Sequence, residues 1–133
     1  MSINSYAKIN LFLRIGKRLG SGYHNLQAVM QKIELSDSIS IEPINEDRII
    51  VECTNKELEN ENNLAYKAAL LLKKKFKLRH GAKIFIEKNI PIEAGLGGGS
   101  SDAATALLNL NKLWGLKLKE KQSCLKKAFP SWK

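Results

Sequence analysis

The most informative part of this sequence is Pro91-Ile92-Glu93-Ala94-Gly95-Leu96-Gly97-Gly98-Gly99-Ser100-Ser101-Asp102-Ala103-Ala104. Four glycines between positions 95 and 99 are followed by two serines and then by residues that favour a helix. Glycines let backbone N–H groups come close to an anion, and the N-terminus of a helix adds positive partial charge. A tight turn alone needs one or two glycines, so the cluster predicts a phosphate-binding loop.

The spacing excludes the three best-known loops of this kind. A Walker A loop requires a lysine after its last glycine, and none follows Gly97, Gly98 or Gly99. The dinucleotide pattern GxGxxG fails because position 100 is serine. The glycine loop of protein kinases fails at the same position and lacks its companion motifs.

Periodicity on both sides of the loop predicts an α+β domain with a sheet packed against helices. Alternation predicts strands over residues 7–15 and 38–42, the second stopping at Pro43, and β-branched or apolar runs predict strands over 48–53 and 83–87. Glycines 16, 20 and 22 predict a turn, and an apolar stretch follows from residue 26 to 35. Helices are expected from Leu64 to about Lys75, with asparagine caps before it and Gly81 ending it, then over 103–113 and 119–129.

Composition indicates a single globular domain. The chain has 133 residues, of which 44% are apolar and 26% charged, and this balance excludes collagen-like and disordered chains. Without a secretory leader, an apolar run of about 18 residues or metal-type cysteine spacing, a cytoplasmic protein is expected. The net charge is +9, and residues 112–133, with seven lysines and one glutamate, hold +6 of it.

The loop pattern PxxxGLGGGSSDAA resembles the ATP loop of the GHMP kinases. Two further segments, Ala7–Leu13 and Gly22–Gln27, are similar to the family of 4-diphosphocytidyl-2-C-methylerythritol kinases. This resemblance implies a GHMP kinase N-terminal domain of the ribosomal protein S5 domain 2-like fold. It also implies the transfer of phosphate from ATP, with Mg²⁺, to a hydroxyl of a small cytidine-diphosphate substrate in the non-mevalonate isoprenoid pathway.

The resemblance also assigns roles to individual residues. Residues 91–101 would bind ATP, Lys8 would be the catalytic lysine, and Ser100 or Ser101 would reach the metal ion. Asn10, Tyr23 and His24 match substrate-binding positions, the last two facing the cytosine.

Three acidic residues are given no catalytic role. Asp102 fits the helix dipole, Asp37 is expected to make a local turn bond, and Glu93 is not assigned to the metal.

The chain departs from the family in its last residues. The catalytic aspartate of the family, in a Gly-Ala-Asp-Val-Pro-like segment, is missing, and no acidic residue follows Glu120. We therefore expect an ATP-binding domain over 1–118, a divergent basic tail over 119–133 and no C-terminal GHMP domain. Such a truncated form would have little or no activity alone and would self-associate through the surface left exposed.

Two alternatives remain open on the sequence alone. One is another small-molecule GHMP kinase, and the other is a non-enzymatic, basic, RNA-binding domain of the S5 type. Neither a membrane partner nor a nucleic acid is expected under the main interpretation.

Overall fold

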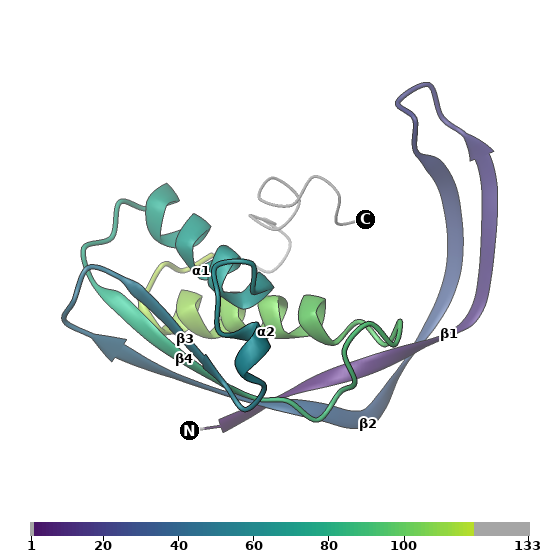
Figure 1. The fold of residues 1–133 in the computed structure, drawn as a ribbon. Helices are drawn as coiled ribbons and strands as arrows, with labels where there is room; N and C mark the ends of the chain where they lie inside the picture. The colour runs from purple at the N-terminus through teal and green to yellow at the C-terminus, as the bar shows by residue number, and fades with distance from the viewer. Residues whose placement is uncertain (1, 119–133) are drawn as a thin grey trace.

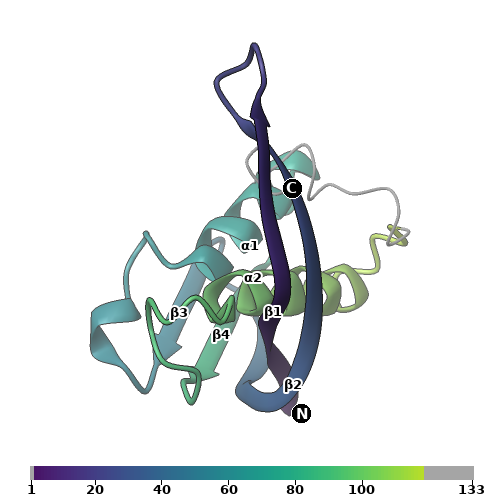
Figure 2. The same cartoon turned by 90° about the vertical axis from the view of Figure 1, so that its right-hand side faces the viewer.

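The computed structural model describes residues 2–118, so the helix expected over 119–129 and the basic tail lie outside the described residues. A four-stranded sheet forms one layer, in the order β1-β2-β4-β3, and two helices cover one of its faces (Figures 1 and 2). The elements are β1 (Ser2–Arg18), β2 (His24–Ile44), β3 (Ile49–Cys53), the short 3₁₀ helix η1 (Lys56–Leu58), α1 (Leu64–Lys75), β4 (Gly81–Glu87) and α2 (Gly98–Leu113). The α+β architecture predicted from the sequence is confirmed.

Strands β3 and β4 pair in parallel, and the chain crosses between them through α1. The other two pairings, β1 with β2 and β2 with β4, are antiparallel. Strand β4 is therefore central, and Ile84 and Ile86 on it are fully buried beneath the helices. The helices approach the sheet closely because many of their core residues are small, namely Ala65, Ala68, Ala69, Ala103 and Ala106. The larger side chains of the same core include Leu72, Leu107, Leu110, Ile39 and Cys53.

Strands β1 and β2 continue well beyond the sheet as a two-stranded arm, which comprises residues 9–31 (Figure 1). The register between β1 and β2 shifts at the base of the arm, between Tyr6 and Lys8. Apolar side chains of the arm are exposed, with Leu11 at 62% and Ile15 at 66%. Within residues 2–118, no third strand or helix pairs with or packs on this arm.

The end predicted for the second strand was wrong. Strand β2 does not stop at Pro43 but runs to Ile44, with Pro43 opposite Ala82 of β4. Strand β1 pairs with β2 only as far as Ser40, so at Pro43 the side of β2 that faces away from β4 is a free edge. The N–H that proline lacks therefore removes no hydrogen bond on this free edge.

The second error concerns Gly81, which was expected to end the first helix. Helix α1 runs from Leu64 to Lys75, as predicted, and the residue with a left-handed conformation after it is Lys77, at φ 51°, and not Gly81. Gly81 begins β4, where a Cβ would lie 2.0 Å from the Arg48 carbonyl oxygen and 2.3 Å from that of Glu46. The glycine is therefore required by the close approach of two backbones.

No helix within residues 2–118 is long and apolar enough to cross a membrane.

Candidate nucleotide site

The glycine-rich loop joins β4 to α2, and the helix starts inside the glycine cluster. Helix α2 begins at Gly98 rather than at Ala103, and its N-cap is Gly97 in the left-handed conformation at φ 73°. No side chain caps this end. The first N–H groups of α2 are therefore left for another acceptor, which is the arrangement that binds phosphate.

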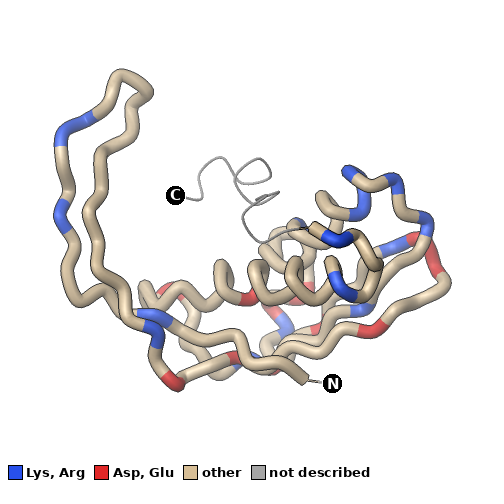
Figure 3. Tube along the Cα trace, turned by 180° about the vertical axis from the view of Figure 1, so that it is seen from behind, with Lys and Arg blue, Asp and Glu red and all other residues tan. Residues whose placement is uncertain are grey.

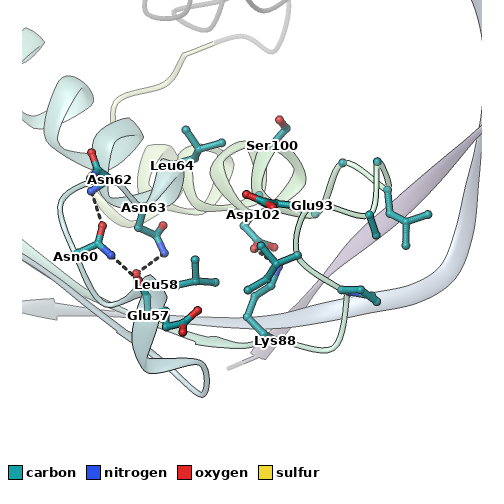
Figure 4. A pocket seen from close by; sticks show the side chains of 18 residues that line it. Glu57, Leu58, Asn60, Asn62, Asn63, Leu64, Lys88, Glu93, Ser100 and Asp102 are labelled. Atoms are coloured by element: carbon teal, nitrogen blue, oxygen red, sulfur yellow. Dashed lines mark hydrogen bonds and ion pairs between the residues drawn. The ribbon is translucent and has the colours of Figure 1, made fainter.

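A cavity of about 500 Å³ lies between this loop and the segment that precedes α1 (Figure 4). The loop supplies one wall with Glu93 and Ser100, whereas Ser101 is not among the lining residues. The opposite wall is Glu57, Leu58, Asn60, Asn62, Asn63 and Leu64, and Lys88 and Asp102 line the rest. The volume is in the range of a small-molecule site.

The asparagines at the second wall have two functions. Asn63 is the N-cap of α1, and its side-chain oxygen accepts from the Ala65 N–H at 2.9 Å, as the sequence predicted. Asn60 and Asn62 were not predicted to line a site. The run of polar amides between two apolar segments was visible in the sequence, but only the topology brings it opposite the loop.

Lys8 of β1 contacts the loop directly. Its ammonium donates a hydrogen bond of 2.7 Å to the Gly95 carbonyl oxygen, and its backbone N–H donates one of 2.9 Å to that of Leu96. The ammonium also lies 3.4 Å from the side-chain oxygen of Asn10. A Cβ at Gly97 would lie 3.1 Å from the Lys8 Cε atom, so the lysine stem packs against the loop. The structure therefore brings Lys8, Asn10 and the loop together.

Tyr23 and His24 lie at the tip of the arm and are not brought to this cluster. Tyr23 lies in the turn and is 60% exposed, and His24 is the first residue of β2. Ten residues of strand separate Lys8 from Arg18 beside the tip, which corresponds to roughly 30 Å along the strand. Figure 1 shows the arm rising away from α2.

A buried group of charges lies behind the loop. Lys88 follows β4, and its ammonium is 2.5 Å from the Asp37 Oδ2 atom and 3.1 Å from the Asp102 Oδ2 atom. The other oxygen of Asp37 accepts from the backbone N–H groups of Asn89 and Ile90 at 2.6 and 2.8 Å. The local turn bond expected for Asp37 was wrong, because its partners lie 51 to 53 positions away.

Burial raises the pKa of Asp102 to about 6, although the charge of Lys88 acts in the opposite direction. Burial lowers the pKa of Lys88, but its hydrogen bond to Asp37 and the charge of Asp102 outweigh this and leave that pKa raised. Asp102 is therefore not simply an acidic residue placed by the helix dipole, as expected, but part of a buried ion cluster. No motif in the sequence indicated that Lys88 would belong to this cluster.

Known proteins share this fold and this loop. Residues 63–127 match the family described as GHMP kinases N terminal domain. A mevalonate kinase from Methanococcus jannaschii, 22% identical, superposes with a TM-score of 0.66 over 98% of this chain and 47% of its own, which supports the fold alone. Residues 63–127 of the chain thus resemble the N-terminal domain of the GHMP kinases.

Other known proteins are more similar to this chain than the mevalonate kinase is. The 4-diphosphocytidyl-2-C-methyl-D-erythritol kinase of Caldicellulosiruptor saccharolyticus is 48% identical over 123 residues, which are 92% of this chain and 42% of that kinase. The enzyme of the same name from Clostridioides difficile is 46% identical over 119 residues, covering 89% and 40%. A crystal structure of 4-(cytidine 5'-diphospho)-2C-methyl-D-erythritol kinase matches with a TM-score of 0.77 and 36% identity, covering 90% of this chain and 42% of that one. The chain thus spans about two fifths of the length of the curated relatives it matches.

Proposed function

We propose that residues 1–118 form the ATP-binding domain of a kinase that phosphorylates 4-diphosphocytidyl-2-C-methyl-D-erythritol in the non-mevalonate isoprenoid pathway. The observation that carries the ATP site is the uncapped N-terminus of α2, which opens from Gly97 beside a cavity of about 500 Å³. The substrate rests on the names of the relatives, which are 46–48% identical over most of this chain.

In this proposal, residues 91–101 bind the nucleotide. The backbone N–H groups at the start of α2 donate to phosphate oxygens, and their fixed dipoles stabilise the charge that develops during transfer. The cavity wall formed by Asn60 and Asn62 presents amide groups that can both donate to and accept from a base.

Lys8 is the proposed catalytic residue. Its ammonium is already held against Gly95 by a 2.7 Å hydrogen bond, so a positive charge stands at the edge of the proposed phosphate site. There it would stabilise negative charge on the transferred group, and Asn10 beside it would bind the acceptor hydroxyl.

The arm suits an anionic substrate. Residues 9–31 include Arg14, Lys17 and Arg18 and contain no Asp or Glu (Figure 3). Tyr23 and His24 at its tip are proposed to bind the cytosine, with the diphosphate lying along the positively charged arm between them and Lys8. A cytidine-diphosphate substrate is shorter than the roughly 30 Å of strand between the tip and Lys8, so this assignment requires the tip of the arm to come closer to the loop when the substrate binds.

The residues present fit a magnesium ion that enters with ATP. Among residues 2–118, no three His, Cys, Asp or Glu side chains gather to form a complete cage. Mg²⁺ commonly keeps several waters and takes one or two protein oxygens together with phosphates. The Ser100 hydroxyl lines the cavity and would be such an oxygen, whereas Ser101 does not line it. When bound, the ion would neutralise phosphate charge.

Little or no turnover is proposed for the 133-residue chain by itself. The segment that carries the general base in the family is not found in this sequence, and a general base contributes typically 10²–10⁴-fold. Three carboxylates line the cavity, those of Glu57, Glu93 and Asp102, and Asp102 is paired with Lys88 and buried.

Two measurements test the proposal. Isothermal titration of the full chain with Mg²⁺-ATP is expected to give saturable binding, and ADP release with the cytidine-diphosphate substrate is expected to stay near background. Absence of nucleotide binding by folded protein would contradict the ATP site. Steep, salt-sensitive RNA binding with indifference to ATP would favour an RNA-binding domain, and failure of CDP to compete with the substrate would favour another small-molecule kinase.

A further inference from the structure

The buried Asp37 holds the start of the segment that leads into the glycine-rich loop. This aspartate is 0% exposed, and its Oδ1 atom accepts from two consecutive N–H groups, those of Asn89 and Ile90. In addition, the Asn89 side-chain amide donates to the Ser36 carbonyl oxygen at 3.1 Å. Strand β2 therefore fixes the chain directly after β4, just before the loop begins at Pro91.

Lys88 connects the same aspartate to the far end of the loop. Its ammonium bridges Asp37 on β2 and Asp102 in the second turn of α2, at 2.5 and 3.1 Å. It also lies against Gly98, where a Cβ would come within 3.2 Å of the ammonium nitrogen. One cation thus contacts both the strand side and the helix side of the loop.

Between these two ends, the loop is held by the two hydrogen bonds that Lys8 donates to the Gly95 and Leu96 carbonyl oxygens. Residues 91–95 are exposed, and Glu93 and Gly95 have positive φ values of 58° and 71°. Exposed backbone in the left-handed region does not hold its own conformation, so anchoring at the ends determines where the N–H groups point.

We propose that Asp37 and Lys88 are positioning residues that fix both ends of the glycine-rich loop and so hold the N-terminus of α2 in the conformation that binds nucleotide phosphates. The inference deepens the proposed function and rests on it for the identity of the ligand. Preorganisation of this kind strengthens binding because the loop need not be ordered when the ligand arrives.

Two variants of the full chain test the role. Asp37→Asn keeps the volume and one acceptor oxygen but presents an amide NH₂ to Lys88. Lys88→Met keeps the apolar stem and removes the charge. Both are expected to raise the Kd for Mg²⁺-ATP at least about tenfold and to speed amide hydrogen exchange in peptides covering 89–97.

Lys73→Met is the matched control. Lys73 is another buried lysine, 7% exposed, whose ammonium pairs with Asp47 and with the Leu78 carbonyl oxygen at the opposite end of α1 from the cavity. Its removal is expected to lower the melting temperature and to leave the Kd within about twofold of the unsubstituted chain. A purely structural role for Asp37 and Lys88 would make all three variants alike, with lower melting temperatures and unchanged Kd, and would overturn the proposal.

The remaining outcomes are also decisive. If the unsubstituted chain does not bind Mg²⁺-ATP, the proposed function fails. Amide hydrogen exchange in peptides covering 89–97 then still decides whether Asp37→Asn loosens the loop. Should the variants not fold, exchange in the unsubstituted chain is measured with and without Mg²⁺-ATP. Binding of Mg²⁺-ATP is expected to slow amide hydrogen exchange in peptides covering 36–38 and in those covering 88–98. Slowing confined to one of these two regions would overturn the proposal.

Discussion

The Lys8 ammonium and the Gly95 carbonyl oxygen form a hydrogen bond of 2.7 Å between residues 87 positions apart in the chain. This bond joins the base of the arm to the glycine-rich loop. Since the neighbouring Lys8 N–H also donates to Leu96, the strand and the loop are fixed to one another at two points.

Replacement of Lys8 by methionine should therefore affect nucleotide binding itself. The variant is expected to weaken Mg²⁺-ATP binding roughly threefold to tenfold, because a charge-assisted hydrogen bond at a half-exposed site contributes about 1 kcal/mol. Isothermal titration measures the change.

Lys32→Met is the control for Lys8. Lys32 is the cross-strand partner of Lys8, and its ammonium lies 4.4 Å from the centre of the Tyr6 ring rather than against the loop. A similar loss of affinity in both variants would mean that the local positive charge, and not the contact with Gly95, supports binding.

A second prediction concerns Gly97, the N-cap of α2. Gly97→Ala places a Cβ 3.1 Å from the Lys8 Cε atom on a residue with φ of 73°, so both the conformation and the space oppose it. The variant should lose about 1–2 kcal/mol in the free energy of unfolding, measured by urea denaturation, and bind Mg²⁺-ATP more weakly.

Gly20→Ala at the tip of the arm is the comparison. No atom lies within 4 Å of a Cβ there, and Gly20 is not among the residues with positive φ. Its free energy of unfolding should change by less than about 0.5 kcal/mol. Equal losses for the two glycines would contradict the strained conformation assigned to Gly97.

A third prediction follows from the raised pKa of Asp102, which is about 6 in the folded chain against 3.8 as the ordinary value. Between these two values the folded state holds a proton that the unfolded state has released. The stability contributed by that proton is complete below pH 3.8 and is lost as pH rises through 6. The charged groups facing Asp102 are Lys88 and Asp37, from the segment after β4 and from β2.

The variant Asp102→Asn removes this titration and leaves an oxygen for Lys88. Its melting temperature relative to the unsubstituted chain should therefore rise between pH 4 and pH 7 and level off above it. Thermal melts followed by circular dichroism at several pH values measure the difference. A difference independent of pH would show that Asp102 titrates normally in the folded chain.

The loop and α1 could be predicted from the sequence because their signals are local. Glycines 95–99 and the cap at Asn63 act on their immediate neighbours, and Asn63 does cap α1. The pairing of Asp37, Lys88 and Asp102 could not be predicted, since Asp37 and Lys88 are 51 residues apart and only the sheet order β2-β4 joins them. Nor could the arm be predicted, because alternation looks the same in a strand covered by helices and in one that is not.

The arm leads to a last prediction, that the chain self-associates through it. Ile15 and Leu26 are cross-strand partners in the arm, and their side chains are 66% and 62% exposed. A two-stranded hairpin with exposed apolar side chains is marginally stable by itself, so contact with a second arm would stabilise it. Sedimentation velocity should show association that increases with concentration, and Ile15→Ser with Leu26→Ser should shift it toward monomer. Because Arg14, Lys17 and Arg18 repel their counterparts in a second arm, higher salt should strengthen association. Leu108→Ser, a 43% exposed residue on α2, serves as the matched substitution outside the arm, and an equal shift from it would place the contact elsewhere.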